Sequence, residues 1–198
     1  MIRQPHFTRI HVLTDIDNQE LEMIVYGNPK AHQRPRFFRG RGFFGRGHVY
    51  NPDHRLQMQM RDLVQGALAP NLHPVHNPTF FTVESALEVE LDIFMKRPDA
   101  HFIRQNGELL RTFENLRPQS RDLLHLRTPD IDNIIKFILD APMQGVVYAN
   151  DSKIIRLTAT KSWDDHDNCN GRVHIRVKKI NQEAEDFIVI DDEDGIEV

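Results

Sequence analysis

At 198 residues, the chain is long enough for one domain with a substantial core, and its 39% hydrophobic and 27% charged residues are ordinary for a soluble globular protein. No apolar run is long enough to cross a membrane, the first residues lack the apolar core of a secretory signal, and the single Cys169 excludes an internal disulfide and a cysteine-rich zinc site. The net charge of −4 hides a segregation, since residues 183–198 hold eight acidic and no basic side chains, which leaves 25 basic against 21 acidic ones elsewhere. We expect a soluble, intracellular protein, in the cytoplasm or nucleoid of a bacterium or phage system or in the nucleus or an organelle of a eukaryote.

The first part of the chain predicts a strand, a loop and a helix. Residues 21–26 (LEMIVY) predict the strand, and residues 28–51, rich in glycine, proline and arginine, predict the loop. Asn51-Pro52 is typical of a helix start, and the helix is expected to end before Pro70. Its apolar positions at helical spacing are Leu56, Met60, Leu63, Val64, Ala67 and Leu68.

A second strand is expected over residues 84–95, because apolar residues alternate there with acidic ones. The apolar face would hold Leu87, Val89, Leu91 and Ile93, and the acidic face Glu88, Glu90 and Asp92. Residues 97–127 are polar and mixed in charge without a sustained period, so we expect an extended insertion there.

The last part of the domain predicts a second helix and two strands. Pro129 begins this helix, and Pro142 and Gly145 end it. Its apolar stripe is Ile131, Ile134, Ile135 and Ile138, with Asp132, Lys136 and Asp140 at i, i+4 and i+8 on another face. Strands over residues 154–163 and 173–180 follow, joined through the hairpin-type turn signal Asn170-Gly171.

Together these elements predict an α+β domain. The order β-α-β-insertion-α-β-β gives a small mixed sheet with two helices packed on it. The domain is expected to cover residues 20–181, with the insertion at 97–127. An N-terminal extension over residues 1–19 precedes it, and an acidic, disordered tail over residues 182–198 is expected to follow.

Between Met23 and Pro52 the sequence has no acidic residue and six basic ones. The six are Lys30, Arg34, Arg36, Arg39, Arg41 and Arg46. Such a patch fits a phosphate backbone, because each neutralised phosphate releases counterions. Aromatic rings that stack on bases or wedge between them are interleaved with the arginines, namely Phe37, Phe38, Phe43, Phe44 and Tyr50. We favour this DNA-contact interpretation over a flexible surface loop whose rings pack on the body.

Residues 128–161 hold the most informative combination of side chains. Asp130 and Asp132 form an Asp-x-Asp, Lys136 lies one helical turn beyond, and Asp151 precedes the next strand, so that all four can converge on one point. Carboxylate oxygens are hard ligands suited to Mg²⁺ or Mn²⁺. A metal held by Asp130, Asp132 and Asp151 would orient a water, help to deprotonate it and neutralise charge on a phosphate, and Lys136 would face that phosphate as a point charge.

The same residues have a purely structural interpretation. Asp130 follows Pro129 and is well placed to cap a helix, and Asp132 complements the helix dipole. Asp132 and Lys136 also have the spacing of an ordinary ion pair along a helix. From spacing alone, the structural interpretation is the more common one.

A resemblance to a known family favours the catalytic interpretation. The run PDIDNIIKFILDA, followed by NDSKI and by a strand that ends in Lys161, is similar to the central signature of the RusA family of Holliday-junction resolvases. The family motif Asp-x-Asp-Asn-x-x-Lys matches Asp130, Asp132, Asn133 and Lys136, and the catalytic loop aspartate matches Asp151. Asn150 differs, because many members have a second aspartate there.

The resemblance extends beyond this motif. Residues 27–36 and Tyr50-Asn51-Pro52 are similar to the family's first strand and basic loop, so that residues 21–60 and 84–180 are covered. The long insertion at 97–127 and the acidic tail have no counterpart in the family pattern.

The resemblance implies a crossover junction endodeoxyribonuclease in DNA recombination and repair. It implies a homodimer whose two active sites each nick one strand of a branched DNA, with Mg²⁺ as the cofactor and Mn²⁺ as an alternative. Symmetric nicks resolve a four-way junction into two nicked duplexes. Asn133, Asp140 and Lys161 are expected to support the site. Two other functions stay open: a non-catalytic protein that binds branched DNA, and a related metal-dependent nuclease acting on flaps or RNA.

The acidic tail carries a further motif over residues 187–194 (FIVIDDED). Three β-branched residues followed by acids resemble a SUMO-interacting motif, which would add an edge strand to its partner. We prefer a disordered acidic tail that competes with DNA for the basic loop.

Overall fold

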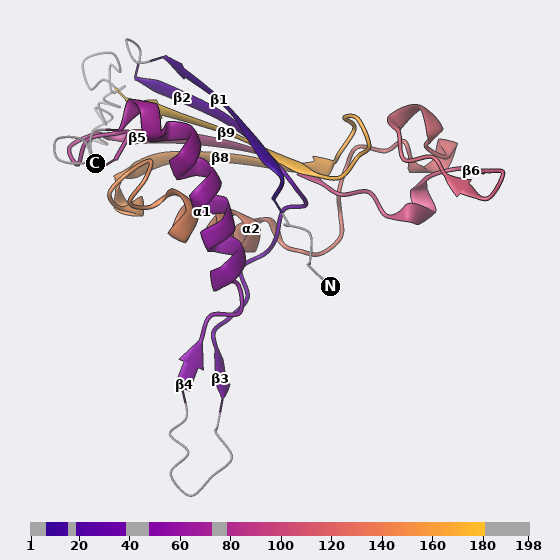
Figure 1. Cartoon of the computed structure of the whole chain (residues 1–198), viewed down its shortest axis with the longest axis horizontal. Helices are drawn as coiled ribbons and strands as arrows, with labels where there is room; N and C mark the ends of the chain where they lie inside the picture. The colour runs from indigo at the N-terminus through magenta and orange to yellow at the C-terminus, as the bar shows by residue number, and fades with distance from the viewer. Residues whose placement is uncertain (1–6, 16–18, 39–47, 73–78, 181–198) are drawn as a thin grey trace, which may run out of the picture.

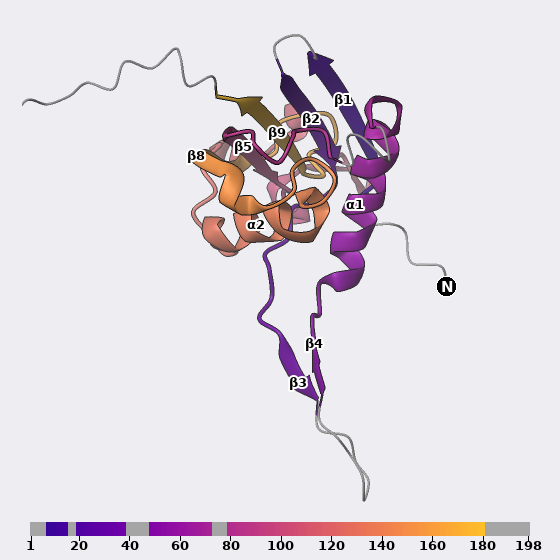
Figure 2. The same cartoon turned by 90° about the vertical axis from the view of Figure 1, so that its left-hand side faces the viewer.

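The structure is a computed structural model that describes residues 7–15, 19–38, 48–72 and 79–180. Its centre is a five-stranded mixed sheet in the order β1-β2-β9-β5-β8, with helices α1 and α2 on one side (Figure 1, Figure 2). The expected α+β class is confirmed. No helix of the described ranges is long and apolar enough to cross a membrane.

The sheet is antiparallel except at one edge. β1 (Arg9–Asp15) pairs with β2 (Glu20–Tyr26), β2 pairs with β9 (Arg172–Lys179), and β9 pairs with β5 (Leu87–Met95), each in antiparallel register. β8 (Ile154–Trp163) runs parallel to β5 and forms the far edge. The connection from β5 to β8 therefore crosses over through α2, as a parallel pair requires.

One core lies between the sheet and the two helices. The predicted alternation of β5 is confirmed, because Leu87, Val89, Leu91 and Ile93 are at most 1% exposed. α1 (His54–Leu68) and α2 (Ile131–Ile138) cover this face with buried residues at helical spacing. These residues are Met60, Val64 and Leu68 of α1 and Ile134, Phe137 and Ile138 of α2. The opposite face of the sheet carries ion pairs, including Arg176 to Glu90 at 2.8 Å and to Asp92 at 2.9 Å.

Two features of the sheet differ from the sequence-based expectation. The predicted N-terminal extension contains β1, whose Ile10 and Val12 pack against the core, so the sheet begins before residue 20. β8 and β9 do not form the predicted hairpin, because β5 lies between them. The segment that ends in Asn170-Gly171 instead carries the chain across the end of β5, and the carbonyl of Cys169 accepts the Arg97 N–H at 3.1 Å.

The predicted loop over residues 28–51 contains a two-stranded ribbon. β3 (Arg36–Phe38) and β4 (His48–Tyr50) pair antiparallel and project from the body (Figure 1). The helix after it starts later than Asn51-Pro52 predicts, since Asp53 is the N-cap of α1. Asn51 still assists the turn, because its Oδ1 accepts the Asp53 N–H at 2.9 Å.

The insertion at 97–127 is a small ordered unit at one end of the sheet (Figure 1). It contains the 3-10 turns η2 (Asp99–His101), η3 (Phe113–Asn115) and η4 (Pro118–Ser120) and the short strands β6 (Arg104–Gln105) and β7 (Glu108–Leu109). Phe102, Leu116 and Cys169 form its own buried cluster. The buried Arg97 joins it to the body, because its guanidinium donates to the carbonyls of Asp164, Ser120 and Asp122 at 2.7, 2.6 and 3.1 Å.

Candidate active site

The start of α2 presents Asp130 to solvent. Asp130 is the N-cap residue, preceded by a cis Thr128-Pro129 peptide bond, and its backbone carbonyl accepts the Ile134 N–H at 3.3 Å. Its carboxylate makes no capping hydrogen bond and is exposed. The helix-capping role that the sequence allows is therefore not what this side chain does, and the carboxylate is free to bind a ligand.

Asp132 and Lys136 are exposed on the same helix without pairing. No ion pair joins them within the part of the chain that the structure describes, so the structural interpretation of their i, i+4 spacing is not borne out. Among the described residues, the Asp132 carboxylate accepts a long hydrogen bond of 3.4 Å from the Asn133 side-chain amide. Within the described residues, the carboxylates of Asp130 and Asp132 therefore lie at the N-terminus of α2 and the Lys136 ammonium group in its last turn, none of them with a neutralising partner.

Lys161 fixes the backbone directly ahead of Asp130. Its Nζ donates to the carbonyl oxygens of Arg127 at 2.9 Å and Pro129 at 2.8 Å. Lys161 is half-buried at the C-terminal half of β8. A charged donor shared by two carbonyls is a strong local restraint, so Lys161 holds the segment that positions the Asp-x-Asp motif.

Asp151 lies in the 3-10 turn η6 (Asp151–Lys153), directly before β8. The Asn150 side chain accepts the Ser152 N–H at 3.0 Å, which orders this turn. Burial, followed by the charges of Asp151 and Asp140, raises the pKa of Tyr148 far above its ordinary value. The Tyr148 hydroxyl donates to the Leu139 carbonyl at 2.7 Å, so this buried phenol joins the turn after α2 to the approach to Asp151.

Asp140 leaves the helical face on which the sequence pattern put it. α2 ends at Ile138, and the following π-type turn η5 (Leu139–Met143) has a non-helical backbone at Asp140, with ψ at −122°. The helix ends earlier than Pro142 predicts because the turn around Pro142 begins three residues before it. Asp140 therefore departs from the helical row of Asp132 and Lys136, and its charge, after that of Asp151, helps to raise the pKa of Tyr148.

The described chain does not bring the three predicted metal ligands together. The hydrogen bond from Lys161 to the Pro129 carbonyl places the start of α2 near the C-terminal half of β8. Ile154, at the start of β8, lies seven residues before Lys161, which corresponds to about 23 Å at 3.3 Å per residue. Asp130 and Asp151 therefore lie toward opposite ends of β8. Across the described residues no three histidine, cysteine, aspartate or glutamate side chains form a group that could hold a metal ion. The shared site of Asp130, Asp132 and Asp151 stays a prediction.

Part of the basic segment lies against the motif helix, a contact that the sequence did not predict. The His32 N–H donates to the carbonyl of Asn133 at 2.8 Å, and the Gln33 N–H donates to the buried carboxylate of Asp53. Lys30 and Arg34 flank these anchors, and Arg36 begins β3. Of the other predicted DNA contacts, Arg39, Arg41 and Arg46 lie outside the described residues, as do Phe43, Phe44 and the motif at 187–194.

A hollow of about 380 Å³, which the sequence does not predict, adjoins the N-terminus of α2. Thr128, Pro129 and the Trp163 ring line it together with His125. The imidazoles of His125 and His101 pack edge-on against Trp163, with ring centroids 4.1 and 4.9 Å away. Burial lowers the pKa of both histidines, and the nearby charges of Lys161 at His125 and of Arg97 at His101 lower it further.

Comparison with known proteins identifies the family. The family description endodeoxyribonuclease RusA matches residues 26–178, which include the Asp-x-Asp-Asn-x-x-Lys motif, Asp151 and the start of the basic segment. No individually curated protein matches the sequence significantly. Because the match covers most of the chain and the residues around the start of α2, the chain belongs to the RusA endodeoxyribonuclease family.

Proposed function

We propose that the chain is a Mg²⁺-dependent, structure-selective endodeoxyribonuclease that resolves four-way DNA junctions by paired symmetric nicks. The observation that carries the proposal is the pair of exposed carboxylates at the start of α2: Asp130 makes no capping hydrogen bond, and neither Asp130 nor Asp132 forms an ion pair with any described residue. A solvent-facing acidic pair costs electrostatic energy next to a phosphate backbone, so a protein that only binds DNA gains nothing from it.

The chemistry of these donors fits a hard divalent cation. Asp130 and Asp132 would hold Mg²⁺, with Mn²⁺ as an alternative. Asp151 is the proposed third ligand, which requires the turn that carries it to approach α2 when metal and DNA bind. When bound, the metal supplies Lewis-acid neutralisation of phosphate charge and a lowered water pKa. Lys136 is one turn from Asp132 and would bind a non-bridging phosphate oxygen, while Lys161 keeps the backbone carrying Asp130 in position.

Homodimerisation is part of the same proposal, because one site per subunit cuts two strands of a junction with two-fold symmetry. The edge of the sheet supports it. β8 is an edge strand, and Ile155 on it is 66% exposed, while Leu124, which forms a bridge to Ser162, is 62% exposed. An edge with exposed apolar side chains is a surface that a second copy can cover. Sedimentation equilibrium of the full chain and of Ile155→Lys tests this, since the proposal expects a dimer that the lysine weakens.

The nuclease is tested with a labelled four-way junction and a linear duplex of the same sequence, each in Mg²⁺ and in EDTA. Asp132→Asn is expected to lower the cleavage rate at least about 100-fold while junction binding persists. Asp62→Asn is the matched control, because Asp62 is an exposed aspartate on α1 away from the motif. Equal cutting of both DNAs would remove the branch selectivity, and cutting by Asp132→Asn at the normal rate would refute the catalytic assignment.

A non-catalytic protein that binds branched DNA is the second candidate. It is favoured by the separation of Asp151 from Asp130, which leaves the predicted three-ligand site unassembled in the described chain. Asp151→Asn distinguishes the two. The nuclease proposal expects lost cleavage, and tight junction binding by the native protein without cleavage in either metal condition would favour the binder. Flap and single-stranded RNA substrates in the same assay test the related nuclease activities.

A further inference from the structure

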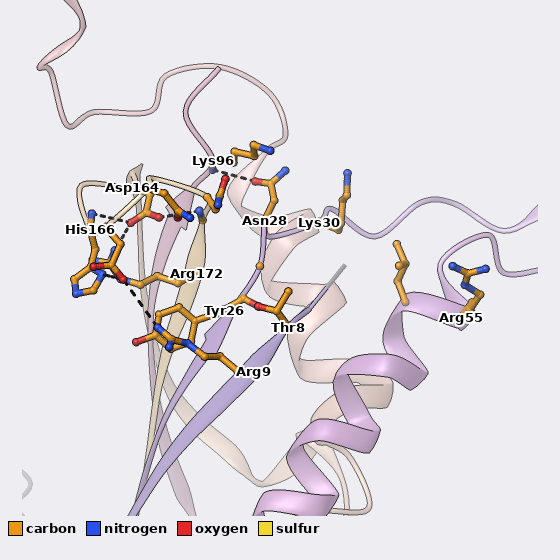
Figure 3. A pocket seen from close by; sticks show the side chains of 16 residues that line it. Thr8, Arg9, Tyr26, Asn28, Lys30, Arg55, Lys96, Asp164, His166 and Arg172 are labelled. Carbon is orange, nitrogen blue, oxygen red and sulfur yellow. Dashed lines mark hydrogen bonds and ion pairs between the residues drawn. The ribbon is translucent and has the colours of Figure 1, made fainter. Parts of the chain in front are cut away.

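A groove of about 990 Å³ lies at the end of the sheet where β2 and β5 end and β9 begins (Figure 3). It is separate from the acidic motif and is lined by residues from several parts of the chain. β1 and β2 contribute Arg9 and Tyr26, the segment after β2 contributes Lys30, α1 contributes Arg55, and the end of β5 contributes Lys96. The segment before β9 closes the other side with polar residues, including Asn168 and Asn170.

The groove carries unneutralised positive charge. Its two acids are already paired, because Asp164 binds Arg172 and Asp167 lies 4.0 Å from Arg9. Lys30, Arg55 and Lys96 have no acidic partner among the described residues. Figure 3 shows Lys96 next to Asn28, Lys30 on the other side of Asn28, and Arg55 farther away on α1. The site therefore presents three free cations together with uncharged amide groups.

Two of these cations, Lys30 and Lys96, are carried by segments that hydrogen bonds hold together. The Asn28 side chain accepts the Lys96 N–H at 3.0 Å, and the Gly27 N–H donates to the Gly171 carbonyl at 3.0 Å. At Gly171 the packing is so close that a Cβ would lie 2.9 Å from the Asn28 Cα, and its φ of +91° also favours glycine. Lys30 and Lys96 thus extend from a fixed junction of three segments.

The groove continues toward the candidate active site. Asn28 and Lys96 line both this groove and the smaller hollow that contains Thr128 and Pro129. Pro129 is bonded to Asp130, and the His32–Asn133 hydrogen bond ties the segment after Lys30 to the same helix. A strand whose reactive phosphate lies at Asp130 would therefore enter the groove past Lys96 and reach Arg55 farther out.

We infer that this groove seats the phosphodiester backbone of the DNA arm next to the cut, with Lys30, Arg55 and Lys96 each neutralising a phosphate. The inference rests on the proposed function, because it takes DNA to be the substrate of the adjacent motif. Small-molecule sites are mostly apolar and largely enclosed. This groove is polar and open-ended and has cations along its length, which is the arrangement that a phosphate backbone requires.

The salt dependence of DNA binding tests the groove. A triple variant, Lys30→Gln, Arg55→Gln and Lys96→Gln, is compared with a control triple of equal charge change, Arg104→Gln, Arg121→Gln and Lys178→Gln, at exposed positions outside the groove. Binding to the junction and to the linear duplex is measured in EDTA across a range of salt concentrations. The groove triple is expected to bind about 10- to 100-fold more weakly at low salt, with a slope of log K against log salt that is shallower by about 2 to 3.

The outcomes separate this inference from the proposed function. If the groove triple and the control triple show the same slope of log K against log salt, the inference that the groove binds DNA phosphates is refuted, whether or not the native protein cuts junctions. If the native protein never cuts DNA but the groove triple alone flattens the salt dependence, the nuclease proposal fails and the groove stands. A native protein that binds neither DNA overturns both.

A second experiment tests whether the DNA passes Lys96 first and Arg55 farther from the cut. Cys169 is buried and its burial raises the pKa of the thiol to about 11, so a cysteine introduced at position 55 or 96 is the reactive one. An iron chelate attached to Arg55→Cys or Lys96→Cys cleaves nearby DNA sugars. Cuts from position 96 are expected closer to the branch point than cuts from position 55, and the reverse order or the absence of cuts from both would overturn the proposed path.

Discussion

Replacing Lys161 by methionine keeps the aliphatic stem but removes both hydrogen bonds to the segment before Asp130. The donors reach the carbonyls of Arg127 and Pro129 at 2.9 and 2.8 Å, and a hydrogen bond from a charged group contributes roughly 1.5–3 kcal/mol. Lys161 is half-buried, so the lower end applies and the two bonds together contribute about 3 kcal/mol. For a chain of this size that corresponds to a fall in Tm of about 6–12 °C.

The same substitution is expected to lower cleavage more than binding. Freed carbonyls allow the backbone of residues 127–129 to move, and a displacement of about 1 Å at a catalytic group costs on the order of 100-fold in rate. We expect kcat on the junction to fall at 20 °C, where the variant is folded, with KM little changed. Lys161→Arg keeps a multidentate donor and should recover part of kcat, whereas the control Lys178→Met should leave both Tm and kcat as they were. A Tm within about 2 °C of the native value together with an unchanged kcat would refute the positioning role.

Three further predictions concern stability. The lowered pKa values of His101 and His125 mean that the unfolded chain binds protons more readily than the folded one. Stability should therefore be complete above pH 6.5, the ordinary histidine value, and fall below it by up to about 1.4 kcal/mol per pH unit for each histidine. Thermal unfolding from pH 5 to 8 measures this, and His125→Gln should weaken the pH dependence; an equal dependence in the variant would contradict the assignment. Arg97→Met leaves three carbonyls without their buried donor and should destabilise the protein by about 3–5 kcal/mol, which urea unfolding measures. Proteolysis within residues 97–127 should also become faster, and a protease time course that shows no faster cleavage there would argue against the anchoring role of Arg97. Gly171→Ala forces a Cβ against Asn28 at a positive φ and should cost about 3 kcal/mol in urea unfolding, whereas Gly66→Ala, which meets nothing within 4 Å, should be neutral or stabilising.

The sequence predicted those elements whose pattern is local. The alternation from Leu87 to Ile93 identified a central strand with one buried face, and the boundaries of β8 at Ile154 and Trp163 agree with the prediction. β1 was missed because it is a half-exposed edge strand whose alternation is weak. The β8–β9 hairpin was wrong because a turn signal such as Asn170-Gly171 shows that the chain reverses but not which strand lies beside it.

In the candidate site too, the features that depend on local sequence were predicted, and those that depend on contacts between distant residues were not. The exposed start of α2 with Asp130 and Asp132 follows from local pattern and capping rules. The Lys161 contacts, the His32–Asn133 hydrogen bond and the groove around Lys96 join residues that are far apart in the sequence, so no spacing rule points to them. The departure of Asp140 from the helical row depends on where the helix ends, and helix boundaries are the part of a fold that local sequence patterns define least well.

The order of strands in the sheet also determines when the sheet can assemble. β2 and β5 are neighbours of β9 and not of each other, and β5 finds its partners only at residues 154–163 and 172–179. During synthesis the β1–β2 hairpin can form early, but β5 must wait with both edges unsatisfied while more than fifty further residues are added. Such non-local pairing makes folding slow, and the waiting strand carries the row Leu87, Val89, Leu91 and Ile93. The charged row of Glu88, Glu90 and Asp92 on its other face disfavours contact between nascent chains until β8 and β9 arrive, with Arg156 to pair with Glu88 and Arg176 to pair with Glu90 and Asp92.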